Sequence, residues 1–424
     1  MKILVVGSGG REHAIVWALQ RNRETPLQIV CAPGNAGIAQ TARCVPINPT
    51  DTSALARFAE TEKISLTIVG GESALAAGVS DEFAARGLRI VGPTQRAARL
   101  ESSKSFAKDF MSRHHIPTAR YRVADSLADA RAILRHGDLG ASVVVKADGL
   151  AAGKGVYVTG SRAEAEQAVE GLMGGAAKTT DAGKRIVLEE RLTGREVSLL
   201  LWTDGRDYRL MPAARDHKRI GEGDTGANTG GMGVVTAADI LDEESLKNIV
   251  REIIEPTLAG ADRDALNFRG VLFIGLMLTG EGARVLEYNV RFGDPEAQAI
   301  LVRLQSDFIS LNERIARREL GSAQVEWSAD ASACVVLAAR GYPENPETGA
   351  RIDGLDEARQ RSDVQIFHAG TQRDEQGVWR TSGGRVLGVT ATAATLDRAL
   401  EKSYATIETI SWDGMQYRRD IGKT

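Results

Sequence analysis

Short apolar runs alternate with amphipathic stretches over the first hundred residues. Apolar runs occupy 3–6, 27–32, 66–70 and 88–92, and helical periodicity follows the first run from about residue 12 to 21. Continuous apolar runs separated by helical segments are typical of strands buried on both faces of a parallel sheet. The pattern therefore predicts an N-terminal α/β unit with a doubly wound parallel sheet.

The remainder of the chain predicts α+β units. Strands are expected over 142–147, 156–159, 185–190, 270–278 and 284–290, with further antiparallel strands within 197–210. Helices are expected over 102–114, 161–173, 242–258 and 395–407. The last hundred residues, from about Trp327, again mix strands with a final helix. Runs of strands interrupted by single helices are typical of α+β folds, so we expect a multidomain chain.

Composition narrows the class of protein. A chain of 424 residues is too long for one ordinary core, and we expect two to four domains. The contents of 43% hydrophobic and 26% charged residues are ordinary for a soluble enzyme. A formal net charge of -3 argues against broad nucleic-acid binding, which usually needs a basic surface.

The cysteines and the N-terminus indicate the compartment. Cys31, Cys44 and Cys334 form no CxxC pair, which argues against a zinc site or a disulfide framework. The opening MKILVVGSGG predicts a first strand rather than a signal peptide, and no apolar run reaches the roughly 18 residues of a membrane span. We therefore expect a cytoplasmic enzyme that binds neither nucleic acid nor membrane.

Two glycine-rich turns follow the first two predicted strands. In GSGGREH, residues 7–13, Glu12 stands where a dinucleotide fingerprint needs its third glycine, and the second strand ends in Cys31 and Ala32 instead of an acid. An NAD site is therefore disfavoured, and contact with a phosphate or substrate is favoured over a plain turn. APGNAG, residues 32–37, lies at the same edge of the sheet, and a tight turn explains it almost equally well.

A third glycine-rich segment, VVVKADGLAAGKGV at 143–156, combines Lys146 at a strand end with Lys154 in the loop. Two lysines and an adaptable loop suit a polyphosphate, although the spacing is not that of a Walker P-loop.

In LEERLTGREVS, residues 188–198, acids end one strand and open the next. They could accept hydrogen bonds from adenine and ribose, but solvated charges are the commoner explanation of such a run.

The densest polar run is VLEYNVRFGDPE, residues 285–296. Glu287 and Asn289 alternate on a strand, so their side chains point the same way and offer two oxygen ligands to Mg²⁺. The polar segment RDHKRIGEGDTGANTGGMG, residues 215–233, predicts a long loop that is either functional or disordered. Its charged start favours a binding role.

The segments 143–156, 188–198 and 285–296, in this order along the chain, resemble the ATP-grasp superfamily. Further segments narrow the resemblance to the phosphoribosylamine–glycine ligase family and cover nearly the whole chain. They are GGREH, APGNAG, the helix that contains Lys104, KADGLAAGKGV, DHKR, NTGGMG, EYNVRFGDPE, FHAGT at 367–371 and GGRVLGVT at 383–390.

The resemblance implies a fold of four parts. They are an N-terminal substrate domain (1–101), an ATP-grasp core (102–122 and 193–325), a small lid (123–192) and a C-terminal α+β domain (326–424). The chain also departs from the family pattern at Ala227, where proline is usual, and in the segment 71–74. Fewer prolines should loosen these loops by enlarging the freedom of the unfolded chain.

The resemblance implies roles for individual residues. Catalytic roles would fall to Lys146, Arg291 and Asp294, and the metal ligands would be Glu287 and Asn289. The nucleotide would be bound by Lys104, Lys146, Gly153, Lys154, Gly155, Glu189, Glu190 and Glu196. The substrates would be bound by Gly9, Gly10, Asn35, Gly37, Asp216, His217, Lys218, Asn228, Gly230, Gly231, Arg291, Gly293 and Asp294.

The implied activity is ATP-dependent ligation of glycine to 5-phosphoribosylamine through a glycyl phosphate, with Mg²⁺ or Mn²⁺, in de novo purine biosynthesis. The products would be glycinamide ribonucleotide, ADP and phosphate, and the family precedent is a monomer. Another ATP-grasp ligase or carboxylase is the alternative. A dehydrogenase is disfavoured because this chain lacks the motif of a nicotinamide site. An ATP-binding regulatory protein is disfavoured because it would not need the metal ligands and RFGDPE together.

Overall fold

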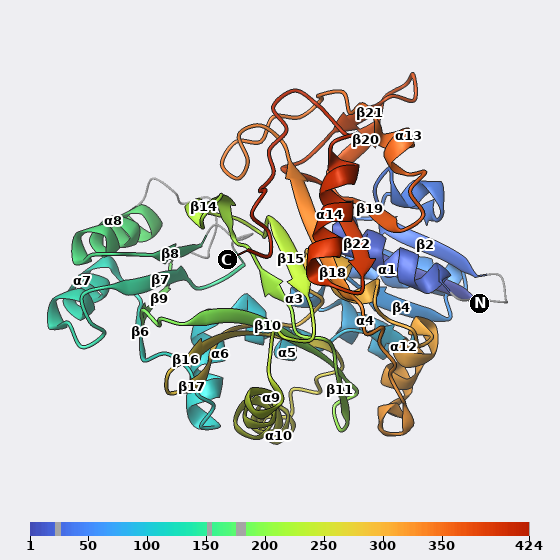
Figure 1. Ribbon diagram of the computed structural model, residues 1–424. Helices are drawn as coiled ribbons and strands as arrows, with labels where there is room; N and C mark the ends of the chain where they lie inside the picture. Colours follow the sequence, from blue (N-terminus) through green and yellow to red (C-terminus); the bar gives the residue numbers. More distant parts are fainter. Residues whose placement is uncertain (22–26, 151–154, 175–183, 424) are drawn as a thin grey trace.

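The computed structural model describes residues 1–21, 27–150, 155–174 and 184–423. Four larger sheets organise the chain (Figure 1). A small sheet covered by α7 and α8 projects on the left, the sheet containing β10 and β16 lies at the bottom, and the N-terminal and C-terminal sheets lie to the right and above. The predicted multidomain α/β and α+β architecture is confirmed.

The N-terminal sheet has five parallel strands in the order β3-β2-β1-β4-β5. The bounds are β1 (Lys2–Gly7), β2 (Gln28–Pro33), β3 (Arg43–Cys44), β4 (Leu66–Val69) and β5 (Ile90–Val91). Its helices are α1 (Gly10–Gln20), α2 (Thr52–Thr61), α3 (Glu72–Ala76) and α4 (Val79–Ala85). The expected doubly wound sheet is present, with a short edge strand, β3, that the apolar pattern does not reveal.

The helix expected over 102–114 is α6 (Lys104–Arg113), and a helix that the pattern did not predict, α5 (Gln95–Ser102), precedes it. Ser103 adopts an extended conformation between them, and its side chain accepts a hydrogen bond from the backbone N–H of Phe106. Serine satisfies a free N–H at a helix start in this way, so it starts a new helix here. The break puts Lys104 at the first position of α6.

The small sheet is antiparallel in the order β6-β9-β7-β8. Its core is formed by apolar side chains of the sheet and of the two helices. The bounds are β6 (Tyr121–Ala124), β7 (Val143–Ala147), β8 (Val156–Val158), β9 (Ile186–Glu190), α7 (Leu127–His136) and α8 (Arg162–Met173).

A second antiparallel sheet has the order β11-β10-β16-β17. The bounds are β10 (Arg195–Thr203), β11 (Tyr208–Leu210), β16 (Gly270–Thr279) and β17 (Gly282–Asn289). The helix expected over 242–258 begins near there but continues through α9 (Glu243–Ile249), a π-helical turn (Val250–Ile254) and α10 (Glu255–Arg263).

The C-terminal sheet, in the order β12-β15-β18-β22-β19, contains two strands from far upstream. The bounds are β12 (Arg215–Asp216), β15 (Gly233–Thr236), β18 (Ala331–Ala338), β19 (Val364–His368), β22 (Arg385–Ala393) and α14 (Leu396–Ile407). Between β12 and β15 lies a hairpin of β13 (Arg219–Gly221) and β14 (Thr225–Asn228). The expectation that 215–233 is entirely loop is therefore wrong, because β12, β13 and β14 lie within it. β12 pairs with β15, which in turn pairs with β18 about a hundred residues later.

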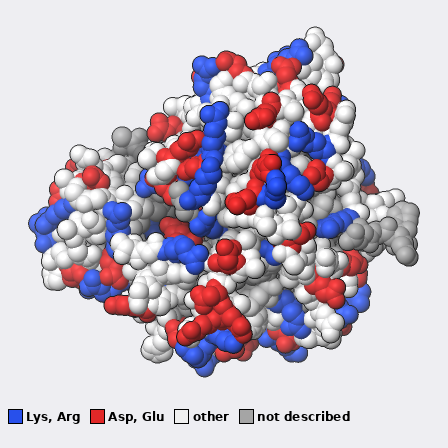
Figure 2. Space-filling model, in the orientation of Figure 1, with Lys and Arg blue, Asp and Glu red and all other residues white. Residues whose placement is uncertain are grey.

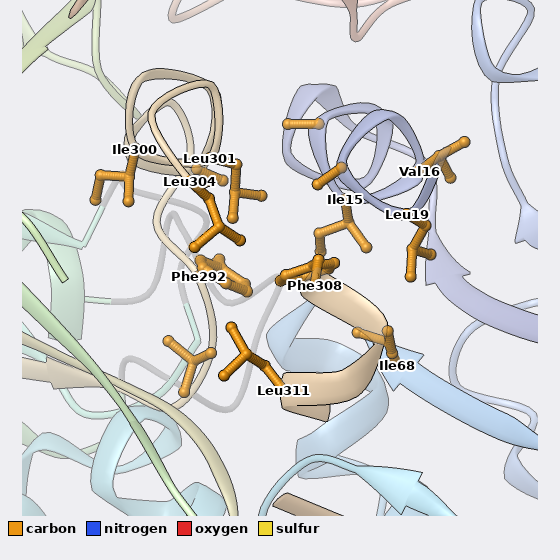
Figure 3. Close-up of a cluster of buried hydrophobic side chains, with 14 of the residues drawn as sticks. Ile15, Val16, Leu19, Ile68, Phe292, Ile300, Leu301, Leu304, Phe308 and Leu311 are labelled. Carbon is orange, nitrogen blue, oxygen red and sulfur yellow. The ribbon is translucent and has the colours of Figure 1, made fainter. Parts of the chain in front are cut away.

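Buried side chains join these layers. Figure 3 shows Ile15 of α1, Phe292 after β17 and Phe308 of α12 converging in one cluster. The stacked rings of Trp202 and Trp327, with centroids 5.7 Å apart, extend it. The remaining elements are α11 (Glu296–Leu301), α12 (Phe308–Arg317), α13 (Leu355–Ala358), β20 (Thr371–Arg373) and β21 (Trp379–Thr381).

On the surface in Figure 2, acidic and basic side chains are interspersed over most of the visible face. Among the described residues, no helix combines the length and the apolar character that crossing a membrane requires.

The C-terminal tail, residues 418–423, contacts the segment between β12 and β15. Arg418, with a fully buried side chain, forms ion pairs with Asp224 (2.6 Å) and Asp420 (2.7 Å). The Gly422 N–H donates to Nε2 of His217 at 3.0 Å, and the Arg215 guanidinium donates to the Gly422 carbonyl at 2.9 Å. The tail therefore holds the start of this segment and the turn between β13 and β14.

We expect Arg418→Met to lower the free energy of unfolding by about 2–4 kcal/mol, because it leaves two carboxylates without their cation. The hydrogen bond from Arg418 lowers the pKa of Asp420 to about 2. A carboxyl with a lowered pKa stabilises the fold above its ordinary pKa and loses that contribution as pH falls toward 2. Urea unfolding should thus show the deficit at pH 7 and a smaller one near pH 3. The exposed Arg419→Met is the control, and an equal effect in both variants would contradict the assignment.

Candidate active site

A cavity of about 790 Å³ lies where the small sheet, the β10–β16–β17 sheet and the two other sheets meet. Its wall includes Lys146 and Glu189 from the small sheet, Glu287 from β17, Glu72 from the N-terminal unit and Arg385 from β22. A cavity of this size accommodates a nucleotide or a pair of small substrates. Charged groups from every part of the chain thus face one space.

Three buried charges form the centre of one wall. Glu189 on β9 pairs through one oxygen with Lys146 on β7 and through the other with Lys108 on α6, each at 2.8 Å. The Lys146 ammonium also donates to the carbonyl of Leu286 at 3.0 Å. Leu286 lies at a bulge in the β16–β17 ladder, and bulges redirect backbone groups out of the ladder. Lys146 therefore bridges the small sheet to β17.

Lys104 lies beside this group at the start of α6. Its ammonium donates to the carbonyl of Gly149 at 3.0 Å, and burial lowers its pKa. Asp148 accepts hydrogen bonds from the backbone N–H and the hydroxyl of Ser105, so the turn after β7 is tied to the start of α6. Gly155 lines the cavity, whereas the predicted Gly153 and Lys154 lie outside the described residues.

The other acids of the predicted nucleotide region have protein partners. The Glu190 carboxylate accepts from the backbone N–H of Arg120 at 2.8 Å and from its Nε at 2.6 Å. Glu196 pairs with Lys218 at 3.0 Å. Both acids line the cavity, and their roles toward adenine and ribose stay predictions.

The predicted metal ligands Glu287 and Asn289 both line the cavity from β17. Burial alone would raise the pKa of Glu287, but Lys218, Lys146 and Lys104 outweigh it and lower that pKa. An ionised oxygen beside an amide oxygen suits a hard cation, and phosphates and waters would complete its shell. Among the described residues no group of three acids, histidines or cysteines is placed to hold a metal ion, and the role of Glu287 and Asn289 as metal ligands stays a prediction.

Arg291 is fixed by acids from the N-terminal unit. Its guanidinium pairs with Glu101 at 2.6 Å and with Glu72 at 3.1 Å, and it donates to Oδ1 of Asn289 at 3.2 Å. Burial would raise the pKa of Glu72, but Arg291 and Arg11 lower it to about 2. The arginine thus links a predicted metal ligand to α3 and α5.

Asp294 connects the same turn to the C-terminal sheet. Its carboxylate pairs with Arg385 of β22 at 3.3 Å and accepts from Gln298 at 2.7 Å. Arg385 also donates to the carbonyls of Asp294 and Gly230. Gly293 lies directly against Glu296, where a side-chain carbon would come within 2.2 Å of a carboxylate oxygen.

Asp216 and Glu296 contribute a second acidic region. Burial, and then the neighbouring Glu296, raise the pKa of Asp216 well above its ordinary value. Burial likewise raises the pKa of Glu296, which accepts from the Ser198 hydroxyl at 3.1 Å. Gly231, at φ +111, lies so close to Asp216 that a side-chain carbon added there would come within 2.7 Å of an Asp216 oxygen.

Other predicted substrate residues divide into two groups. Lys218, Asn228 and Gly230 line the cavity. Although His217 is part of that wall, its buried imidazole contacts the carbonyl of Gly233 and the N–H of Gly422. Those contacts give the ring a role in holding the tail.

Gly9, Gly10, Asn35 and Gly37 belong to the junction of the N-terminal and C-terminal sheets. The Asn35 amide donates to the carbonyls of Ser8 and His368. Added side-chain carbons at Gly9, Gly10 and Gly37 would meet Asp294, Gln298 and His368. None of these four is among the described residues that line the cavity, so their predicted contact with substrate remains untested.

The sequence analysis predicted no role for four charged residues of the site. They are Arg11, Glu101, Lys108 and Arg385. Lys108 follows Lys104 by one helical turn, so the two could have been placed on one face of the helix. Glu101 and Arg385 reach the site only through tertiary packing.

Three family models match the chain. They describe the N domain (residues 1–101), the ATP-grasp (A) domain (102–297) and the C domain (332–424) of phosphoribosylglycinamide synthetase. Curated relatives called phosphoribosylamine–glycine ligase include one from Xylella fastidiosa, 46% identical over 100% of this chain and 97% of its own. Another, from Clostridium acetobutylicum, is 43% identical over 100% of both chains.

Solved structures agree. The phosphoribosylamine–glycine ligase of Thermotoga maritima matches with a TM-score of 0.83 and 33% identity, over 99% of this chain and 100% of that one. Biotin carboxylase from Campylobacter jejuni, at TM-score 0.72 and 16% identity over 98% and 92% of the two chains, shares the fold. The chain therefore belongs to the phosphoribosylamine–glycine ligase family of ATP-grasp, carbon–nitrogen bond-forming ligases.

Proposed function

We propose that this chain joins glycine to 5-phosphoribosylamine at the expense of ATP, giving glycinamide ribonucleotide, ADP and phosphate. The observation that carries the proposal is one cavity in which lysines suited to phosphates adjoin the ionised Glu287 and a second acidic region. Family membership over the full chain supports the choice of substrates. We further propose that the reaction takes place in the cytoplasm and that the chain acts as a monomer.

The residues of the cavity suit two successive steps. An oxygen of the glycine carboxylate attacks the γ-phosphorus of ATP, and the bond to the β–γ bridging oxygen breaks to release ADP. The amine of 5-phosphoribosylamine then attacks the acyl carbon of glycyl phosphate, the carbon–oxygen bond to phosphate breaks, and the amine proton leaves with the phosphate. The acyl phosphate converts a poor leaving group into a good one.

Lys104 and Lys146 would hold the nucleotide phosphates and offset the charge that develops during transfer. Glu287 and Asn289 would hold Mg²⁺ or Mn²⁺, which neutralises phosphate charge when bound. Arg291 and Asp294 would orient the substrates, since both are fixed by neighbours from other parts of the chain. The small sheet, which shares the Lys146 wall with β17, would exclude water from the reactive intermediate.

We also infer the division into 1–101, 102–122 with 193–325, 123–192 and 326–424. The separate sheets support it, with the addition that β12 and β15, which lie within 193–325, complete the C-terminal sheet.

Release of phosphate from ATP should require both glycine and freshly generated 5-phosphoribosylamine. A coupled phosphate assay with each substrate left out in turn tests the substrate pair. Turnover with a different carboxylate and amine, and none with this pair, would contradict the proposed substrates while leaving family membership intact.

Glu287→Gln should lower kcat by about 100-fold or more, since metal neutralisation of transferring phosphate is worth several kcal/mol. The change keeps the shape of the side chain and removes its charge, so thermal unfolding should stay close to that of the parent. Glu281→Gln, in the turn before β17 with its side chain 84% exposed, is the matched control. Near-parental turnover of the Glu287 variant at ordinary Mg²⁺ concentrations would remove Glu287 from the metal site.

A further inference from the structure

Lys108 is a buried lysine that none of the proposed steps uses. Its side chain is 2% exposed and so is that of its partner Glu189. A buried ammonium is costly unless paired, so a lysine held in this place needs a reason beyond packing.

The ammonium of Lys108 is engaged by neighbouring protein groups. Its ammonium pairs with Glu189 at 2.8 Å, donates to the Thr118 hydroxyl at 2.8 Å and lies 5.9 Å from the centre of the Tyr121 ring. An ammonium has three N–H donors, and Glu189 and Thr118 engage two of them. Lys108 therefore has little capacity left to hold a ligand directly.

The Lys108 contacts lie where the chain crosses into the small sheet. The Thr118 hydroxyl donates to the carbonyl of Val285 at 2.6 Å, and the backbone N–H of Val285 donates to the carbonyl of Pro117 at 2.8 Å. Val285 immediately precedes Leu286, whose carbonyl accepts from Lys146. Lys108 and Lys146 are thus linked twice, through Glu189 and through β17.

The charges in this group do not balance. Two ammonium groups share the one carboxylate of Glu189, which leaves one positive charge in excess beside the cavity. Without Lys108, Glu189 and Lys146 would form a closed neutral pair. A neutral Glu189–Lys146 pair attracts a polyphosphate weakly. The group with both lysines carries a net positive charge and attracts it more strongly.

We propose that Lys108 is a positioning residue for ATP: by occupying one oxygen of Glu189, it keeps the ammonium of Lys146 available to the nucleotide phosphates. Glu189 then acts on the nucleotide by fixing Lys146, and its carboxylate is not the group that recognises adenine. The inference rests on the proposed use of ATP but is independent of which carboxylate and amine are joined.

A double-mutant cycle on ATP affinity tests the proposal. Lys108→Met should weaken equilibrium binding of MgATP by about 10- to 100-fold, because Glu189 then neutralises Lys146. Adding Glu189→Gln should recover most of this loss, since the amide leaves the Lys146 charge uncompensated. Lys108→Arg, which keeps the charge, should stay within a few fold of the parent, and the exposed Lys247→Met serves as the control.

Recovery in the double variant separates positioning from a purely structural role, because two structural defects in one cluster would not improve binding. A double variant that binds MgATP no better than Lys108→Met, or a Lys108→Met protein with parental affinity, would overturn the proposal. Thermal unfolding checks that each variant folds. If the Met variant does not fold, Lys108→Gln replaces it in the same cycle with the same expected loss of affinity, because its amide carries no charge to offset Glu189. Because binding is measured without glycine or amine, an error in the proposed substrates cannot produce either result.

Discussion

The rest of the site depends on the sharing of one buried carboxylate, Glu189, by two buried lysines. Ionised groups can leave water only when other charges or hydrogen bonds replace their hydration. Glu189 satisfies that requirement for Lys108 and Lys146 while leaving their combined charge positive. Since one lysine comes from α6 and the other from β7, the arrangement also fixes the small sheet against the rest of the chain. The lysines around Glu287 likewise lower its pKa despite its burial, which suits the cation binding proposed for it.

Around Arg291 and Asp294, the cavity is likewise held by ion pairs between residues from different parts of the chain. Arg291 is held between Glu72 and Glu101 of the N-terminal unit, and Asp294 meets Arg385 of the C-terminal sheet. The residues that would meet the substrates are therefore not placed by their own loops. The C-terminal tail adds to this control by holding the segment between β12 and β15 through Arg418.

The sequence predicted the strands and the strand-end residues well, because both depend on local patterns. Lys146 could be placed at a strand end, and Glu287 on a strand in alternation with Asn289, from the apolar runs alone. Helix α5 was not foreseen, because only the side-chain cap of Ser103 separates it from α6, and a serine is neutral in a helical pattern until it caps a new helix. The pairing of β15 with β18 and the arrival of Arg385 at Asp294 depend on contacts between distant segments, which local periodicity does not contain. Resemblance supplied the substrates and most of the assigned roles, which geometry alone would have left open.

In the proposed reaction, the carboxylate is activated by phosphorylation before the amine attacks. Transfer of oxygen from substrate to phosphate tests it most directly. With glycine labelled by ¹⁸O in its carboxylate, mass spectrometry of the inorganic phosphate released during turnover should show one labelled oxygen per phosphate formed. Phosphate that carries no label while glycine is consumed would mean that the γ-phosphoryl group never bonds to the carboxylate, and the account would be contradicted.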